Sequence, residues 1–177
     1  MNLSLQDKIK SVIRDVPNFP KEGILFKDIT PILLDPILVD ELVSAMVVQF
    51  KDDAIDAVAG IESRGYLFGI LLAQKLQVPF IMIRKEGKLP AKTIKESYDL
   101  EYGSATIEVH EDAIVPGSNV LIHDDLLATG GTAIAAGKLI QQKAKVAGFS
   151  FVIALEFLNG IQHLNEMSLN TKSLITY

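Results

Sequence analysis

Residues 120–132 read VLIHDDLLATGGT, an apolar run followed by two carboxylates and a loop of small residues. The apolar run predicts a buried strand, and a helix is expected to begin at about Thr132, so the loop joins a strand end to a helix N-terminus. Gly130 and Gly131 allow backbone conformations that point successive N–H groups into one hollow, and Thr129 and Thr132 add hydroxyl donors. Together with the positive end of the helix dipole, this pattern is typical of a phosphate-binding loop.

Similar apolar runs elsewhere in the chain indicate a layered α/β fold. They cover residues 57–61, 80–83 and 151–155, and two helical patterns, about 66–76 and about 132–143, alternate with them. Nearly continuous apolar runs are typical of strands covered on both faces, as in a parallel sheet. We therefore expect an α/β protein with a central, mostly parallel, twisted sheet flanked by helices and with ligands at the carboxyl ends of the strands.

Two further helices are expected before the first of these strands. Residues 4–14 have apolar side chains at helical spacing behind a Ser4 N-cap, and residues 35–50 repeat the apolar pattern. Residues 19–34 indicate irregular structure with short extended pieces. No repeat or linker divides the chain, so a single domain over residues 1–177 is predicted.

Composition excludes several classes of protein. The chain has 177 residues, a net charge of −5, 49% hydrophobic residues and no cysteine. This apolar content is too high for a disordered chain, and the lack of cysteine excludes disulfides, thiolate zinc sites and cysteine nucleophiles. The acidic balance argues against nucleic-acid binding, and no apolar run reaches the roughly 18–20 residues of a membrane span. We expect a soluble, cytoplasmic protein that binds neither nucleic acid nor membranes.

The adjacent Asp124 and Asp125 predict a ligand that contains more than a phosphate. Carboxylates beside a phosphate loop repel the phosphate unless they bind another part of the ligand, such as the vicinal hydroxyls of a ribose or a Mg²⁺ ion. The pattern therefore predicts a sugar-phosphate site. The alternative is a strand–loop–helix turn capped by an Asp. Neither a Walker-type phosphate loop nor a dinucleotide-binding GxGxxG motif occurs.

Two other segments carry positive charge at positions suited to binding an anion. Residues 62–65 follow a predicted strand and begin a helix, which makes Arg64 a second candidate anion ligand; the alternative is a helix-start residue that extends into solvent. Residues 85–103 form a long polar excursion with an excess of basic side chains, expected to be a hairpin over a ligand site. Here the alternative is a solvated face. Residues 106–109 alternate like an exposed strand.

Four blocks of sequence resemble the type I phosphoribosyltransferases. Residues 124–132 resemble the segment with which these enzymes bind 5-phosphoribosyl 1-diphosphate (PRPP), in the variant of the adenine phosphoribosyltransferases. Residues 19–31, residues 60–69 and the segments 83–90 and 98–103 agree with further blocks of that family, in order and spacing, so the resemblance spans nearly the whole chain. It implies transfer of the phosphoribosyl group of PRPP to N9 of adenine, giving AMP and diphosphate in purine salvage.

The resemblance also implies the fold and the partners. It predicts the type I phosphoribosyltransferase fold, with small hood elements in about residues 1–34 and a mobile loop in about residues 84–105. Mg²⁺ is the implied cofactor, adenine and PRPP are the small-molecule substrates, and a homodimer is the implied assembly.

The same resemblance implies roles for individual residues. PRPP is expected to bind through its ribose 5-phosphate at Asp124, Asp125, Ala128, Thr129, Gly130, Gly131 and Thr132. Diphosphate binding and loop closure are expected at Glu62, Ser63, Arg64, Arg84, Lys85, Lys88 and Tyr102, with a cis peptide bond near Glu62 and Ser63. Adenine is expected against Leu25, Phe26 and Lys27. The residues expected to be catalytic are Glu101, Asp125 and Arg64. No direct metal ligand is assigned, because Mg²⁺ is expected to arrive with PRPP near Asp124 and Asp125.

Two residues depart from the family pattern, and one assigned residue has an ordinary alternative. Lys27 stands where many members have Arg, which changes little if backbone atoms bind the base. His123 precedes the acidic pair where an apolar residue is usual; we expect an uncharged strand histidine, the alternative being that it tunes Asp124. Glu101 is expected to handle the proton of the incoming base, the alternative being an exposed hairpin acid.

Three other functions stay open from the residues alone. One is transfer to another purine base. Another is a non-catalytic, PRPP-binding regulatory protein, which would bind PRPP without turnover and carry a basic docking face. The third is a structural α/β domain with an idle site.

Overall fold

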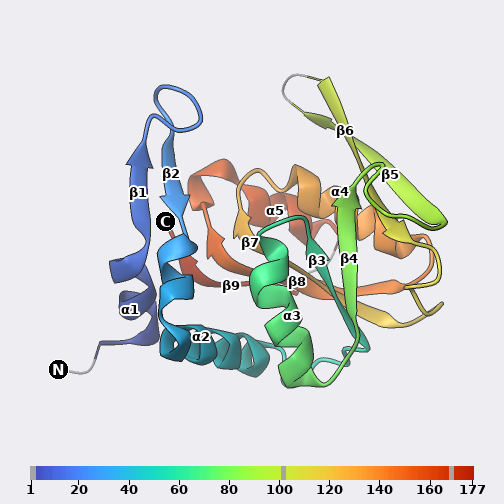
Figure 1. The fold of residues 1–177 in the computed structure, drawn as a ribbon, viewed down its shortest axis with the longest axis horizontal. Helices are drawn as coiled ribbons and strands as arrows, with labels where there is room; N and C mark the ends of the chain where they lie inside the picture. The colour runs from blue at the N-terminus through green and yellow to red at the C-terminus, as the bar shows by residue number, and fades with distance from the viewer. Residues whose placement is uncertain (1–2, 101–102, 168–169) are drawn as a thin grey trace.

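The central sheet is mostly parallel, as predicted. The structure is a computed structural model that describes residues 3–100, 103–167 and 170–177. In that part of the chain the main sheet has seven strands in the order β5-β6-β4-β3-β7-β8-β9 (Figure 1). The parallel strands are β4 (Phe80–Lys85), β3 (Ala57–Ile61), β7 (Asn119–Leu127), β8 (Lys145–Ala154) and β9 (Thr171–Thr176). β6 (Gly103–His110) pairs antiparallel with β4 and forms a hairpin with β5 (Thr93–Leu100).

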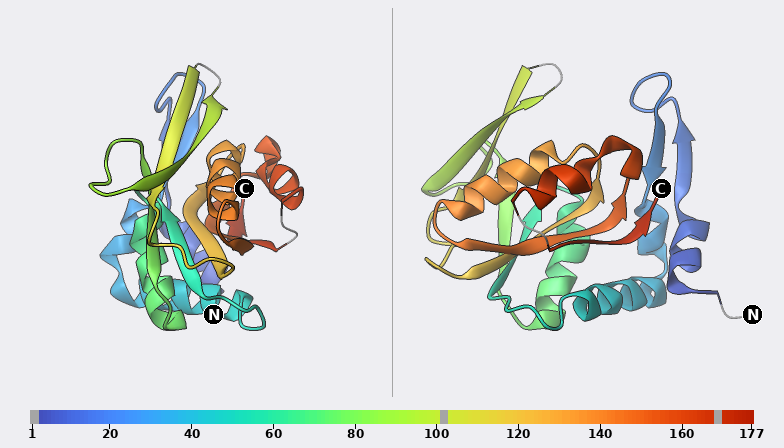
Figure 2. Two further views of the ribbon diagram at one scale, coloured as in Figure 1. Left: turned by 90° about the vertical axis from the view of Figure 1, so that its right-hand side faces the viewer. Right: turned by 180° about the vertical axis from the view of Figure 1, so that it is seen from behind.

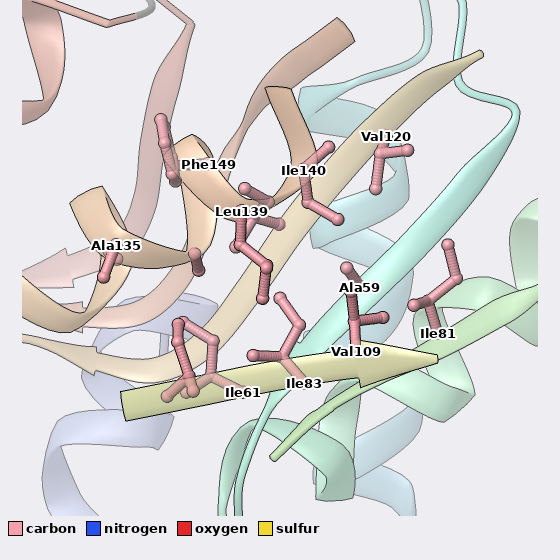
Figure 3. Packing of buried hydrophobic residues seen from close by; sticks show 14 of the residues in the cluster. Ala59, Ile61, Ile81, Ile83, Val109, Val120, Ala135, Leu139, Ile140 and Phe149 are labelled. Atoms are coloured by element: carbon pink, nitrogen blue, oxygen red, sulfur yellow. The ribbon is translucent and has the colours of Figure 1, made fainter. Parts of the chain in front are cut away.

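Helices cover both faces of this sheet (Figure 2). The bounds of those on one face are α1 (Leu5–Val12), α2 (Pro36–Gln49) and α3 (Gly65–Leu76), and those on the other are α4 (Gly131–Gln141) and α5 (Gly160–Asn165). On the α4 face, Leu139 and Ile140 pack toward Ile83 and Val109 of the sheet (Figure 3). On the other face, fully buried Phe68 and Leu72 of α3 belong to a second apolar cluster shared with α2. Each face of the sheet therefore has its own core.

Two of the predicted helices, α1 and α2, begin with a side-chain cap, and the one at Ser4 was expected. Ser4 Oγ accepts a hydrogen bond from Asp7 N at 3.1 Å, and Asp35 Oδ1 accepts from Ile37 N and Leu38 N at 3.0 and 3.1 Å. Each cap satisfies backbone donors that the first turn of a helix leaves unpaired. The structure confirms the four helices predicted from the apolar spacing, with ends that differ by a few residues.

Two hairpins project from the edge of the sheet where β3 and β4 end. One is β1 (Arg14–Pro17) with β2 (Leu25–Asp28), a separate two-stranded sheet followed by the 3₁₀ helix η1 (Thr30–Leu34). The other is β5–β6, which stands on the opposite side of the molecule (Figures 1 and 2). The irregular segment expected at 19–34 thus contains one short strand and one short helix, and the expected hairpin in 85–103 is present.

Two expectations differ from the structure. Residues 106–109 do not form an exposed strand, because Ile107 and Val109 are buried in the α4 core and Glu108 is covered on the other face by the turn after β4. No element was predicted after residue 155, but the chain continues as η2 (Glu156–Leu158), α5 and β9. β9 is an edge strand with only two buried apolar side chains, so it lacks the continuous run that marked the inner strands.

Within the described ranges, no helix combines the length and apolarity that crossing a membrane requires.

Candidate functional site

The loops after β3 and β7 meet at one edge of the sheet. These two strands are parallel neighbours, with Gly60 paired to His123 in register. Residues 62–64 and 128–130 therefore leave the sheet side by side, as the pattern of strand ends predicted. β4 is the other parallel neighbour of β3. The candidate site is built from the loops after β3 and β7 and from the turn after β4.

The loop after β7 surrounds a small cavity. It has a volume of about 100 Å³ and is lined by Asp124, Leu126, Leu127, Ala128, Thr129, Gly130, Gly131, Thr132, Ala133 and Phe151. Gly130 has φ = 88°, a left-handed conformation that favours glycine, and no side chain caps the α4 N-terminus behind it. The first N–H groups of α4 are thus available to an anion in this cavity.

Two residues that the sequence analysis missed support this loop from behind. The His163 Nδ1 donates to Thr129 O at 2.9 Å, and a Cβ on Gly160 would collide with the carbonyl oxygen of Ala128. Both belong to α5, about 30 residues further along the chain. No local pattern indicates these contacts, although glycine at the start of a helix is a weak signal of a close approach.

Replacing Gly160 with Ala should displace the 128–132 loop and weaken AMP binding by about 10-fold, since small shifts of positioned groups have large effects. Calorimetric titration with AMP measures the effect. Gly117→Ala is the control, because Gly117 lies outside the loop and a Cβ there meets no atom within 4 Å. Equal AMP affinity in both variants would show that the contact between Gly160 and Ala128 does not shape the loop.

Asp124 and Asp125 lie beside this cavity, where their negative charges repel each other. Asp124 Oδ1 accepts a hydrogen bond from Asp125 N at 2.9 Å, while Asp125 is 3% exposed. Burial raises the pKa of Asp124 well above its ordinary value, and the negative charge of Asp125 raises it further. A ligand that offers a cation or hydroxyl donors would relieve this repulsion, which matches the predicted ribose or Mg²⁺ contact.

This repulsion predicts that Asp124→Asn stabilises the ligand-free protein. The pKa of Asp124 is higher in the folded protein than in the unfolded chain, so between these two values the unfolded chain loses its proton more readily. The wild-type protein therefore loses stability as the pH rises from the unfolded pKa to the folded pKa, whereas an Asn side chain does not titrate. The Asn side chain keeps the oxygen that accepts from Asp125 N. We expect a melting temperature about 2–4 °C higher at pH 8 and a smaller difference at pH 4, measured by calorimetry. A variant less stable at pH 8 would contradict this.

Arg64 connects three parts of the site. Its Nε lies 2.9 Å from Asp125 Oδ2 as an ion pair, although the two atoms are not aligned as a hydrogen bond. The guanidinium carbon lies 5.2 Å from the centre of the Phe26 ring. The adjacent Gly65 makes this possible, since a Cβ there would come within 2.9 Å of Asp124 Oδ1 and His123 O. The start of α3 therefore packs directly against the end of β7, which brings Arg64 to the acidic pair.

Glu62 gathers the cationic residues that were predicted for a diphosphate. Its carboxylate accepts from Lys85 N and Lys88 Nζ, both at 2.9 Å, and lies 3.4 Å from Arg84 Nε. Burial acts to raise the pKa of Glu62, but these donors and the nearby positive charges outweigh it and hold the pKa below its ordinary value. The predicted cis peptide bond is present between Glu62 and Ser63. The side chain of Lys85 is exposed, so only its backbone joins this cluster.

The segment predicted to bind adenine lies on β2, across from Arg64. Phe26 is half-buried and packs edge-on against Phe19, with ring centres 5.1 Å apart. The Lys27 ammonium lies 2.7 Å from Asp15 Oδ1 and 4.1 Å from the centre of the Tyr177 ring. The Lys27 side chain is thus engaged with Asp15 and Tyr177, whereas the Phe26 ring lies beside Arg64.

Three other predicted residues have different outcomes. Glu101 and Tyr102 lie outside the described residues. His123 is fully buried, its Nδ1 lies 3.3 Å from Ser150 Oγ, and burial lowers its pKa to about 3. It is therefore an uncharged strand histidine, as expected, and it carries no charge with which to tune Asp124.

Comparisons with known proteins find relatives over nearly the whole chain. The sequence matches the family model of the phosphoribosyl transferase domain over residues 29–154. It is 49% identical over 174 residues to the adenine phosphoribosyltransferase of Anaeromyxobacter dehalogenans, covering 98% of this chain and 100% of that protein. The protein of the same name from Mycoplasmoides gallisepticum is 51% identical over 168 residues, 94% of each chain.

Solved structures with the same fold carry the same name. The adenine phosphoribosyltransferase of Thermoanaerobacter pseudethanolicus superposes with a TM-score of 0.94 at 42% identity, covering 98% of this chain and 100% of that one. The enzyme of Saccharomyces cerevisiae, solved with D-2,5-dideoxy-2,5-imino-altritol 1,6-bisphosphate and adenine, superposes with a TM-score of 0.89 at 41% identity, covering 97% and 98%.

Proposed function

The chain belongs to the adenine phosphoribosyltransferase family, and we propose that it transfers the phosphoribosyl group of PRPP to N9 of adenine, giving AMP and diphosphate in purine salvage. The observation that carries this conclusion is the phosphate-sized cavity of loop 128–132 beside two carboxylates and Arg64. The relatives named for this activity match over nearly the whole chain, and one was solved with adenine bound.

The loop 128–132 binds the 5-phosphate of PRPP in this account. The backbone N–H groups at the start of α4 and the hydroxyls of Thr129 and Thr132 are the donors. Charge-assisted hydrogen bonds of this kind contribute about 1.5–3 kcal/mol each, against about 0.3–1 kcal/mol for the helix dipole. Donor geometry therefore accounts for most of the binding.

Asp124 and Asp125 bind the two ribose hydroxyls and lie near the metal ion that accompanies PRPP. Asp125 Oδ2 is buried with no hydrogen-bond partner, so it fits a hydroxyl donor or a cation. Mg²⁺, when bound, would neutralise charge on the diphosphate and take most of its ligands from PRPP oxygens. In the described segments no group of three or more acidic or histidine side chains is arranged to hold a metal ion.

The reaction is a displacement at C1′ of the ribose. N9 of adenine forms the new bond to C1′ while the bond from C1′ to the diphosphate oxygen breaks, and the proton of the base passes to Glu101. Arg64, Arg84 and Lys88 stabilise the leaving diphosphate, and Asp125 stabilises the positive charge that develops on the ribosyl group. Holding both reactants in line supplies much of the remaining acceleration.

The mobile loop of about residues 84–105 closes over bound PRPP, and Tyr102 completes the closure. A closed loop excludes water, which would otherwise attack the reactive ribosyl centre. The position of the β5–β6 hairpin supports this proposal, because the hairpin projects beyond the end of β4, on the side of the molecule opposite β1–β2 (Figure 1).

The hood of about residues 1–34 supplies the base site, with Leu25, Phe26 and Lys27 along β2. Phe26 stacks on the purine. Backbone C=O and N–H groups of Leu25 and Lys27 complement the exocyclic amino donor and the N1 acceptor of adenine, a pattern that oxopurines lack. The engaged side chain of Lys27 supports this, since it leaves only backbone groups of that residue to the base.

A second copy of this chain is the partner we propose, covering the outer face of α3. Ile70 of α3 is 54% exposed and Met82 of β4 is 44% exposed, on the same side of the sheet as exposed Leu67. A stable interface needs about 1,200–2,000 Å² of buried surface, and apolar side chains of this size suit its centre. Sedimentation should show a dimer that Ile70→Glu converts to monomer; a wild-type monomer would contradict the proposal.

The remaining assignments concern the whole protein. We propose one domain over residues 1–177 that works in the cytoplasm, because PRPP, AMP and diphosphate are charged metabolites that need a carrier to cross a membrane.

The activity test is adenine-dependent release of diphosphate from PRPP in the presence of Mg²⁺. Adenine, hypoxanthine and guanine should be supplied together at equal concentration, and AMP is expected as the main nucleotide product. Formation of IMP or GMP instead would favour transfer to another base. PRPP binding without diphosphate release would favour a regulatory protein.

A further inference from the structure

A buried carboxylate outside the ligand-binding loops organises the turn after β4. Glu108 lies on β6 and is 2% exposed. Its Oε1 accepts from Lys88 N at 2.9 Å and from Leu89 N at 3.0 Å, and its Oε2 accepts from Thr93 Oγ1 at 3.2 Å. One side chain thus holds the middle of the 86–92 turn and the first residue of β5.

Glu108 stays charged in this environment. Burial acts to raise its pKa, but the two backbone donors, the Thr93 hydroxyl and the positive charge of Lys95 outweigh burial and hold the pKa below its ordinary value. The Lys95 ammonium lies 3.9 Å from Oε2. These hydrogen bonds stabilise this conformation of the turn, because a turn that moved away would leave the buried Glu108 carboxylate without its donors.

The turn held by Glu108 positions two cations. Lys88 O accepts from Arg84 Nη1 at 3.0 Å, and Lys88 Nζ donates to Glu62 Oε1 at 2.9 Å. Arg84 of β4 and Glu108 of β6 also lie opposite each other on the two paired strands. Fixing the backbone of Lys88 therefore fixes both its own ammonium and the Arg84 guanidinium at the Glu62 loop.

We propose that Glu108 is a positioning residue for the diphosphate of PRPP, acting through the Lys88 backbone on Arg84 and Lys88. The inference rests on the proposed function, which assigns these two cations to the diphosphate. It adds a residue that touches no substrate and that lies on β6, whereas Arg84 lies on β4 and Lys88 in the turn after β4. A purely structural Glu108 would affect stability, whereas a positioning Glu108 changes affinity for diphosphate but not for AMP.

The experiment compares three substitutions at Glu108 with one control. Glu108→Gln keeps an oxygen in the place of Oε1, Glu108→Asp keeps the charge but withdraws it by one methylene, and Glu108→Leu removes both acceptors. Glu111→Leu is the control, because the exposed Glu111 carboxylate pairs with Lys143, and Glu111 contacts the turn only through its backbone N–H, which donates to Lys92 O and which the substitution keeps. Steady-state kinetics give KM for PRPP and for adenine, and calorimetry gives Kd for diphosphate and for AMP.

The Asp and Leu variants should raise KM for PRPP and Kd for diphosphate by about 10-fold or more, with Kd for AMP and KM for adenine changed by less than about 2-fold. Glu108→Gln should stay within about 3-fold of wild type in all four constants. Should Glu108→Leu not fold, Glu108→Asp decides the question.

Two results would overturn the inference: unchanged diphosphate affinity in folded Glu108→Asp, or equal losses for diphosphate and AMP. Failure of the wild-type protein to bind diphosphate would instead overturn the assignment of Arg84 and Lys88, and so the proposed function of that loop. The two failures are therefore distinguishable.

Discussion

Replacing Asp125 with Asn is expected to lower kcat/KM for PRPP by about 10²–10³-fold, the effect of removing one group that stabilises charge in a transition state. Asp125 is 3% exposed, and its Oδ2 faces Arg64 without a hydrogen-bond partner. Asn has the same shape but no negative charge, so it cannot stabilise the developing positive charge of the ribosyl group. Most of the loss should appear in kcat.

Steady-state kinetics at saturating adenine measure this effect, with circular dichroism as the check on folding. Asp112→Asn is the matched control, because Asp112 is an exposed acid after β6 that lies outside the site. Activity of the Asp125 variant within about 3-fold of wild type would contradict the role of Asp125 and would favour an idle carboxylate.

Replacing Arg64 with Leu is expected to lower kcat/KM for PRPP by at least about 10²-fold. The variant loses a cation for the diphosphate, and it leaves Asp125 buried beside Asp124 without the ion pair to Arg64. Removing one partner of a buried ion pair typically destabilises a protein by about 3–5 kcal/mol, and the 38% exposure of the Arg64 side chain places its pair below that range. The melting temperature should therefore also fall.

Arg64→Lys separates the two effects of this substitution. Lysine keeps the charge but neither the planar guanidinium nor its contact with the Phe26 ring, so we expect stability near wild type and only partial activity. Arg14→Leu is the control, since Arg14 pairs with Asp28 at 3.6 Å and has a 63% exposed side chain. Equal activity of the Arg64→Leu and Arg14→Leu variants would show that Arg64 has no role in the reaction.

The strand–loop–helix geometry around residues 128–132 was predictable because its information is local. A strand end, two glycines and a helix start follow one another within residues 120–132, and each has its own sequence signal. The caps at Ser4 and Asp35 were predictable for the same reason, since an N-cap bonds to donors two or three residues ahead.

The contacts between distant segments were not predictable from one sequence. Gly160 and His163 support loop 128–132 only because α5 folds back beside it, and nothing near residue 128 indicates this. Glu108 appeared as an exposed position of an alternating strand, but the turn after β4 covers it. Such roles depend on tertiary packing, which overrides local pattern.

The base site shows an intermediate case. The role of Phe26 came from a resemblance to known enzymes, since residues 24–26 alone would pass as ordinary core. The structure instead leaves Leu25 51% exposed and brings the Phe26 ring within 5.2 Å of Arg64. The sequence pattern could not indicate that these apolar side chains are exposed beside the charged groups of the site.

A crystal structure of the enzyme with AMP tests this account most directly. The phosphate is expected in the cavity of residues 128–132, with the ribose hydroxyls on Asp124 and Asp125 and the adenine ring against Phe26. A phosphate bound instead at Arg84 and Lys88, with the base away from β2, would contradict the arrangement of the site.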